Sequence, residues 1–263
     1  MLLLSAVIPK PSIIRFLDAP LGEFLSSDIV KTIVEEDQLE DRVAEEICYL
    51  LQFGDSMMGL RGIRFGLRIP AFTRMQAAAI DAAARIVAQR TKREMPIGMM
   101  APLVVDPIEV LRFREIVEDA TQQAPGGAVT VTIGAMIETP RAVLLIDQIA
   151  PYSDFLSFGT NDLSQFVWAA ARDSADLEFL RAVPYFWTDR RPFESFDIQG
   201  VGHFMREGIE RVRRVSQTIR LGLCGEHSLD PEAVRLCSEC GIDYLSCAPT
   251  RVPEARLLAG QAT

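Results

Sequence analysis

Two carboxylates, Glu138 and Asp162, each close a short apolar run, and one helix-length segment lies between them. The first run reads VTIGAMIE and the second DFLSFGTND. If the two runs are neighbouring parallel strands, their carboxyl ends meet at one edge of the sheet and bring the carboxylates together. Mg²⁺ held by one or two carboxylates keeps positions for substrate oxygens and water. The pattern predicts a Mg²⁺ site for a small anionic substrate.

Other residues that could bind an anion or move a proton lie within the apolar runs or just after them. Guanidinium groups bind phosphate or carboxylate with two parallel hydrogen bonds, and amides and a thiol add donors. The set comprises Arg15, Arg61, Arg64, Gly159, Thr160, Asn161, Cys224, Glu226, His227 and Arg251. Together these residues describe a pocket in which metal and arginine stabilise the enolate of a small phosphorylated or carboxylated anion.

Each of these residues also has a purely structural explanation. A strand-end glutamate can serve a helix dipole or the solvated rim, and Arg61 and Arg64 can form structural ion pairs. Cys224 can be an inert core thiol, and we interpret Cys48 and Cys247 as inert core thiols. From the residues alone, the function stays open at a metal-assisted enzyme acting on small anions.

Apolar runs alternate along the chain with amphipathic helices, which is typical of a parallel sheet. The expected strands are Ser12–Leu17, Gly59–Gly66, Ile97–Leu103, Val129–Glu138, Asp154–Gly159, Ile219–Gly225 and Asp243–Cys247. The expected helices are Ala71–Gln89, Pro107–Ala120, Pro140–Ile149 (with Thr139 as N-cap), Val201–Thr218 and Pro231–Gly241. Polar residues at the strand ends favour one α/β domain over residues 1–263, a (β/α)₈ barrel of the TIM type, with an unsettled edge at residues 1–11.

Two insertions interrupt this alternation. Asp18–Met58 is predicted to be helical in its middle, over Ile29–Phe53. Asp173–Ile198 is rich in aromatic residues and is either a lid or oligomer contact on the active-site face or a satellite core. Its aromatics are Tyr185, Phe186, Trp187, Phe193 and Phe196.

Composition narrows the classes of partner. A net charge of -9 and a pI near 4.9 argue against nucleic acid or an anionic membrane as the main partner. No apolar run reaches the roughly 18 residues needed to span a bilayer, and MLLLSAVI lacks the basic start of a signal peptide.

The odd count of five cysteines favours a reducing, cytoplasmic setting. Cys237 and Cys240 form one C-x-x-C, which we interpret as two small residues on adjacent helical turns instead of a zinc or redox site.

Four long motifs resemble a known family. GAMIETPRA, FLSFGTNDLSQF, LGLCGEHSLDPEAVRLC and YLSCAPTRVPEARLLAGQA are similar to the C-terminal barrel of the phosphoenolpyruvate-utilising enzymes. The likeness runs from about Pro11 to the C-terminus. IIRFLDAPLGEFL, MMGLRGIRFGL and CGEH favour pyruvate phosphate dikinase within that family.

The resemblance implies a role for each matching position. Glu138 and Asp162 match the Mg²⁺ ligands, and Cys224 matches the acid/base at the methylene carbon of the enolate. The substrate-binding positions are Arg15, Arg61, Glu138, Gly159, Thr160, Asn161 and Asp162, with Arg172 matching another substrate arginine of some members. The implied activity is a Mg²⁺-dependent phosphotransferase that interconverts pyruvate and phosphoenolpyruvate through an enolate.

The chain also departs from the family pattern. No swivelling phosphohistidine domain and no nucleotide-binding domain is recognisable, and neither His203 nor His227 lies in the family's histidine segment. We therefore expect a partial reaction, with the phosphoryl group supplied by a phosphohistidine on another chain or missing domain. We also expect a homodimer. CGEHSLDP replaces the family's CGEHGGDP and thereby stiffens the loop beside Cys224.

The family's first barrel strand has no counterpart. Leu2–Ile8 cannot pair in parallel with Ser12–Leu17, because such a crossover needs about a dozen residues. We expect seven family strands and a gap that is open, covered by the N-terminal segment in a non-parallel way, or closed by a partner chain.

Two other classes of function remain as alternatives. One is a non-catalytic module that senses phosphoenolpyruvate or pyruvate, or an inactive fragment. The other is an aldolase- or lyase-type barrel acting on oxaloacetate-like acids. Cys224 favours the phosphotransferase, since a sensor needs no thiol and such lyases take their proton elsewhere.

Overall fold

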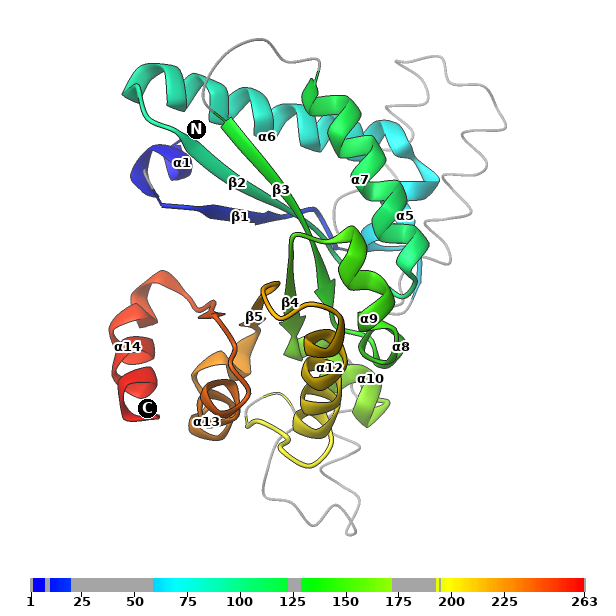
Figure 1. Ribbon diagram of the computed structural model, residues 1–263, viewed down its shortest axis with the longest axis vertical. Coiled ribbons are helices and arrows are strands. Elements are labelled where there is room, and N and C mark those ends of the chain that lie inside the picture. Colours follow the sequence, from blue (N-terminus) through cyan, green and yellow to red (C-terminus); the bar gives the residue numbers. More distant parts are fainter. Residues whose placement is uncertain are drawn as a thin grey trace, which may run out of the picture.

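The computed structural model describes residues 2–7, 10–19, 59–122, 129–171, 193 and 195–262. Within these residues the fold is built on one sheet of six parallel strands. The strands are β1 (Ser12–Arg15), β2 (Met95–Ala101), β3 (Val129–Ile137), β4 (Phe155–Gly159), β5 (Arg220–Cys224) and β6 (Tyr244–Leu245). They lie in the sheet in chain order, and every pair is parallel. The sheet curls into a half-barrel (Figure 1).

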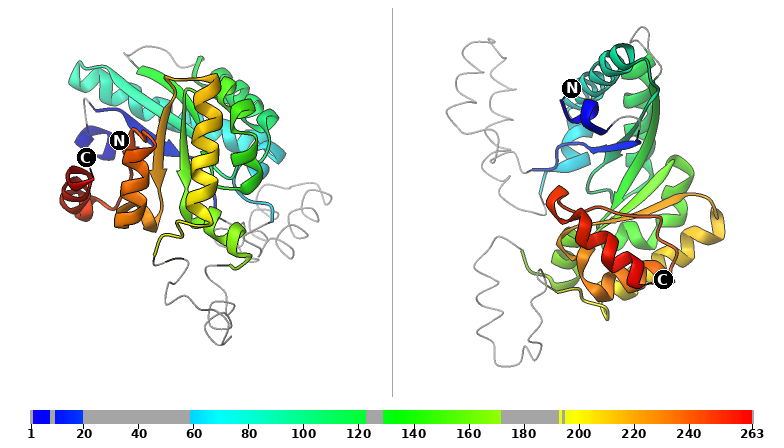
Figure 2. Two further views of the ribbon diagram at one scale, coloured as in Figure 1. Left: turned by 60° about the horizontal axis from the view of Figure 1, so that its bottom comes forward. Right: turned by 90° about the vertical axis from the view of Figure 1, so that its left-hand side faces the viewer.

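Helices cover the outer face of the curled sheet (Figures 1 and 2). They are α1 (Leu2–Val7), α5 (Gly62–Arg68), α6 (Pro70–Thr91), α7 (Pro107–Gln122), α8 (Pro140–Leu144), α9 (Ile146–Ile149), α10 (Thr160–Trp168), α12 (Val201–Val215), α13 (Pro231–Glu239) and α14 (Val252–Gln261). Short 3₁₀ turns are η1 (Ala150–Tyr152), η2 (Glu226–Leu229) and η3 (Pro249–Arg251). The alternation of strand and helix confirms the predicted α/β class, while the described strands amount to a half-barrel.

The core lies between the sheet and this helical layer. All five residues of β4 are buried, as expected for a parallel strand covered on both faces. Phe16, just after β1, packs edge-on against Phe113 of α7 with ring centroids 4.8 Å apart. Cys237 of α13 is 3% exposed and belongs to the same core. The C-x-x-C therefore begins inside a helix, as predicted.

The predicted strand at Gly59–Gly66 is wrong, because residues 62–68 form helix α5. β2 is already bonded to β1 on one edge and to β3 on the other, so no edge is left there for a further strand. The chain turns at Gly62 (φ +57°), and Ile63 donates its N–H to the Pro102 carbonyl at 3.1 Å. Six family strands are therefore described where seven were predicted.

Two smaller predictions also change. The helix expected over Pro140–Ile149 is divided into α8 and α9 at Leu145, although Thr139 caps it as predicted by accepting the Ala142 N–H at 3.1 Å. Leu2–Val7 forms helix α1, which contacts α6. Nearly all of the insertion at Asp18–Met58, with its helical middle, lies outside the described residues. No described helix is both long enough and apolar enough to cross a bilayer.

Candidate active site

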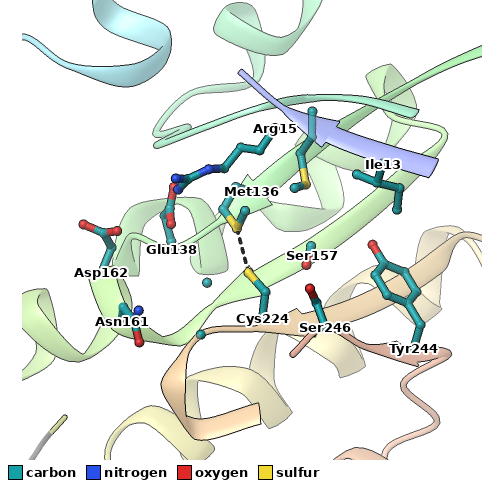
Figure 3. Close-up of a pocket in the computed structure, with 13 residues that line it drawn as sticks. Ile13, Arg15, Met136, Glu138, Ser157, Asn161, Asp162, Cys224, Tyr244 and Ser246 are labelled. Atoms are coloured by element: carbon teal, nitrogen blue, oxygen red, sulfur yellow. Dashed lines mark hydrogen bonds between the residues drawn. The ribbon is translucent and has the colours of Figure 1, made fainter. Parts of the chain in front are cut away.

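A cavity of about 360 Å³ lies at the carboxyl ends of the strands. All six strands, or the residues that directly follow them, contribute to its wall (Figure 3). The lining residues are Ile13, Arg15, Met100, Met136, Glu138, Ser157, Gly159, Asn161, Asp162, Cys224, Gly225, Tyr244 and Ser246. Six of the predicted site residues therefore face one space: Arg15, Glu138, Gly159, Asn161, Asp162 and Cys224.

Three buried carboxylates meet at one end of this cavity. Asp18, Glu138 and Asp162 each offer one oxygen, and these oxygens lie within 4.8 Å of one another. The residues are 5%, 2% and 7% exposed, respectively. Glu138 and Asp162 were predicted to converge, but Asp18 was missed as a member of the site. The available signal was its position, because Asp18 follows the apolar run Ser12–Leu17 as Glu138 follows its own strand.

Short contacts fix the orientation of Glu138 and Asp162. Glu138 directly follows β3, and its Oε1 accepts the Leu103 N–H at 2.7 Å. Gly159 lies so close that a Cβ there would stand 2.4 Å from Glu138 Oε2. Asp162 lies in the first turn of α10, where the helix dipole favours a carboxylate, and its Oδ1 accepts the Gln165 side-chain N–H at 2.9 Å.

The two predicted arginines take different places. Arg61 is 4% exposed, does not line the cavity, and forms ion pairs with both Asp18 and Asp162. Its Nη2 lies 2.6 Å from Asp18 Oδ2, and its Nη1 lies 2.9 Å from Asp162 Oδ1. Arg15 lines the cavity with a side chain that is 43% exposed, and its Nη1 contacts Asp18 Oδ2 at 3.0 Å (Figure 3). Arg15 is thus placed to meet an anion, whereas Arg61 is placed to position the acidic group.

The carboxylates carry more negative charge than these contacts neutralise. Burial, followed by the charges of Asp162 and Asp18, raises the pKa of Glu138 well above its ordinary value. Burial also raises the pKa of Asp18, although Arg61 acts in the opposite direction. Burial lowers the pKa of Arg61, but its contacts with Asp18 and Asp162 outweigh this effect and raise it overall. Such mutual destabilisation of carboxylates is relieved by a hard cation.

The donor set therefore fits Mg²⁺. Oδ1 of Asp162 and Oε1 of Glu138 are engaged in the hydrogen bonds already described. Their second oxygens, Oδ2 and Oε2, are the ligand atoms on offer. Both oxygens of Asp18 accept hydrogen bonds from Arg61, so Asp18 acts first as the counter-charge that holds this arginine.

The Cys224 thiol lies at the end of β5, on the same cavity. Its Sγ lies 3.3 Å from Met136 Sδ (Figure 3). Thr160 Oγ1 donates to the Cys224 carbonyl at 3.1 Å, and Gly225 adopts a φ of +117° directly beyond. Burial, and then the negative charge of Glu138, raises the pKa of the thiol to about 11. Cys224 is therefore protonated at neutral pH and can donate a proton into the cavity.

The remaining predicted residues support the walls or lie elsewhere. Thr160 is fully buried, and Asn161 Oδ1 accepts the Glu226 N–H at 2.9 Å. Arg251 is exposed and pairs with Glu254 at 2.7 Å, away from the cavity lining. Arg172 and Cys48 lie outside the described residues. So do Tyr185, Phe186 and Trp187, but Phe196 is fully buried in the core, which supports the satellite-core interpretation for that residue.

Three polar residues that line the cavity were not predicted from the sequence: Ser157, Tyr244 and Ser246. Ser157 acts on the Cys224 thiol through a hydrogen bond that lowers its pKa. Tyr244 lines the cavity with a phenol whose pKa burial raises to about 12. Ser157 lies in β4, Tyr244 lies in β6, and Ser246 directly follows β6. The alternation of side chains along each strand was the signal that could have found them.

Comparison with known proteins agrees with this geometry. The family model described as "PEP-utilising enzyme, PEP-binding domain" matches residues 2–263. Pyruvate, phosphate dikinase of Rhizobium meliloti is 38% identical over 99% of this chain and 30% of its own length. The chloroplastic pyruvate, phosphate dikinase of Mesembryanthemum crystallinum is 38% identical over 95% of this chain and 27% of its own. The chain thus spans less than a third of the length of these curated relatives.

A solved structure shows a looser likeness. Pyruvate kinase of Cryptosporidium parvum superposes with a TM-score of 0.43 and 13% identity, over 69% of this chain and 35% of that one. A likeness this low says nothing about the chemistry of the cavity.

Proposed function

Because the chain belongs to the PEP-binding domain family of the phosphoenolpyruvate (PEP)-utilising enzymes, we propose that it binds PEP and pyruvate and interconverts them through the enolate of pyruvate. The observation that carries this proposal is the convergence of two carboxylates, one half-exposed arginine and one thiol on a single cavity, with Asp18 as a third carboxylate directly beside the first two. A Mg²⁺ ion on Glu138 and Asp162 would supply positive charge for the oxygens of the substrate.

Side chains of the chain itself would bind the substrate and transfer the proton. The Arg15 guanidinium binds the anionic end of the substrate, and Arg61 keeps Asp18 and Asp162 in position. When PEP loses its phosphoryl group, the electron pair of the broken P–O bond remains on the enolate. The Cys224 S–H then gives its proton to the methylene carbon, which forms the methyl group of pyruvate and leaves a thiolate. The reverse reaction returns that proton to sulfur.

The phosphoryl acceptor lies outside the described cavity in this proposal. Relatives named as pyruvate, phosphate dikinases are about three times longer than this chain, so we assign the acceptor to a histidine on another domain or chain. This histidine becomes phosphohistidine when PEP is the substrate and is the phosphoryl donor when pyruvate is the substrate. Within the described residues, His227 is 1% exposed in η2, and His203 lies on α12, the helix that precedes β5 along the chain and packs against α8 and α9. Neither histidine lines the cavity.

The proposal is tested without any phosphoryl donor. In deuterium oxide, the chain with Mg²⁺ is expected to exchange the methyl protons of pyruvate, as followed by NMR. Cys224→Ala should abolish the exchange. Cys240→Ala, which removes a partly buried thiol at the C-cap of α13 outside the cavity, should retain it. Pyruvate that binds without exchange would instead support the non-catalytic sensor.

A further inference from the structure

The two oxygens of the Asp162 carboxylate have different surroundings. Oδ1 lies 2.9 Å from Arg61 Nη1 and also accepts the Gln165 Nε2–H at 2.9 Å. Asp162 lines the cavity, whereas neither Arg61 nor Gln165 does. Two N–H donors thus occupy Oδ1, and Oδ2 is the oxygen left for a cation in the cavity.

The contact between Gln165 and Asp162 has a fixed direction. An ionised carboxylate only accepts hydrogen bonds, so the Gln165 amide must turn its N–H groups towards Asp162. Gln165 follows Asp162 by three residues on α10, which places both side chains on one face of the helix. Gln165 is 4% exposed, so its side chain has few alternative rotamers. It can therefore hold the Asp162 carboxylate in one orientation.

Glu138 is held in a similar way at the same end of the cavity (Figure 3). Its Oε1 accepts the Leu103 N–H at 2.7 Å, which leaves Oε2 for a cation. Leu103 is fully buried and has a φ of +53°. A left-handed backbone is unfavourable for leucine, and here it is retained where the N–H meets a carboxylate of the site. Each of the two carboxylates therefore has one oxygen engaged by an uncharged N–H donor.

This arrangement bears on which cation the site accepts. Mg²⁺ requires a nearly ideal octahedron of oxygens at about 2.0–2.1 Å, whereas Ca²⁺ takes six to eight oxygens in flexible geometry and accepts both oxygens of one carboxylate. Both ions carry two charges, so the negative charge of the site does not distinguish them. A carboxylate that is held at one oxygen presents only the other, which suits the smaller ion.

We propose that Gln165 is a positioning residue, which holds Asp162 for coordination through Oδ2 alone and thereby makes the site select Mg²⁺ over Ca²⁺. The inference rests on the part of the proposed function that places a cation on Glu138 and Asp162. Arg61 supplies charge to Asp18 and Asp162 alike. Gln165 adds direction without charge, so its effect is on the choice of cation.

The test measures the Kd of Mg²⁺ and of Ca²⁺ separately, by titration calorimetry on the full chain. Gln165→Met removes the amide donor from a side chain of similar length. We expect the Kd of Mg²⁺ to rise about tenfold or more, because Asp162 loses a partner that orients it. The Kd of Ca²⁺ should change by less than about threefold, because its coordination is flexible.

A second variant and a control make the test specific. Gln165→Asn keeps an amide that is one methylene too short to reach Asp162, and it should change the two Kd values in the same direction as Gln165→Met. Ser164→Ala is the control. Ser164 is 1% exposed on the same helix, and its Oγ has no hydrogen-bond partner among the described residues. Its loss should leave both Kd values within about twofold.

The outcomes separate this inference from the proposed function. An unchanged ratio of the two Kd values in the Gln165 variants overturns the inference, as does an equal change in Ser164→Ala or a wild type that does not prefer Mg²⁺. Failure of both Gln165 variants to fold, as judged by urea unfolding, would also overturn it, since the role would then be structural. A wild type that selects Mg²⁺ through Gln165 but does not exchange pyruvate protons would defeat the proposed function and leave this inference standing.

Discussion

The Arg61 guanidinium lies 2.9 Å from the Asp162 carboxylate, which is 101 residues away along the chain. The same guanidinium contacts Asp18 at 2.6 Å, so one buried cation ties the end of the first strand to the helix that follows the fourth. The contacts of Arg61 fix the positions of Asp18 and Asp162 at the acidic end of the cavity. The predictions below concern Arg61 itself and three nearby site residues, Glu138, Cys224 and Gly159.

Arg61→Met should destabilise the metal-free protein by about 3–5 kcal/mol, because it leaves buried carboxylates without their counter-charge. Mg²⁺ should recover part of the loss by supplying positive charge at the same place. The measurement is urea unfolding with and without Mg²⁺. As a control, Arg112→Met removes an exposed ion pair with Glu115 and should cost less than about 1 kcal/mol. Equal costs for the two variants would contradict the assigned role of Arg61.

Glu138→Gln should flatten the pH dependence of stability in metal-free protein. The pKa of Glu138 is raised in the folded state above its ordinary value of 4.5, so the folded state binds more protons than the unfolded state above that pH. The contribution of Glu138 to the free energy of unfolding is therefore present at low pH and is lost as the pH rises through its folded-state pKa. Urea unfolding between about pH 5 and 8 should show this decline in the wild type and a smaller one in the variant. Glu115→Gln, at an exposed position, should retain the wild-type slope.

Alkylation of Cys224 should be slow at neutral pH and should accelerate towards a midpoint near pH 11. Only the thiolate reacts, and burial raises the pKa of this thiol to about 11. Mg²⁺ should lower that midpoint, since it offsets the charge of Glu138 that helps to raise it. Peptide-level mass spectrometry after iodoacetamide treatment measures the rate. Cys237, which is 3% exposed and has its pKa raised to about 12, serves as the internal comparison and should react more slowly still. A midpoint for Cys224 near 9 would contradict the buried setting.

Gly159→Ala should impair Mg²⁺ binding and pyruvate exchange about tenfold or more, because its Cβ would stand 2.4 Å from Glu138 Oε2 and must displace that carboxylate. Its fold should survive with a loss of about 1–3 kcal/mol. Gly260→Ala provides the control, since a Cβ there meets no atom within 4 Å. It should leave both binding and stability within about 0.5 kcal/mol of the wild type. Mg²⁺ calorimetry and urea unfolding separate the two effects.

Several site residues could be predicted because they directly follow strands that the sequence marks clearly. Glu138, Asp162 and Cys224 come after buried apolar runs, and parallel strands bring such ends to one edge. Asp18 could not be assigned with the same ease. It begins a long insertion, and its role depends on Arg61, which reaches it from 43 residues away.

The stretch Gly59–Gly66 shows why an apolar run can mislead. Its spacing suits a strand or a buried helix, and the deciding fact is that both edges of β2 are occupied. The same arrangement turns Arg61 inwards onto Asp18 and Asp162, so its predicted contact with substrate stays a prediction. Arg15, on the edge strand, is the cation that faces the cavity.

The sequence alone determined the alternation of strands and helices, the parallel α/β class, and the family resemblance, because these depend on local periodicity and on motifs read in order. The tertiary structure alone decided which residue completes the acidic group, which arginine faces the cavity, and that residues 62–68 form a helix where a strand was predicted. These features depend on contacts between residues far apart in the chain, and only the packed sheet brings them within reach of one another.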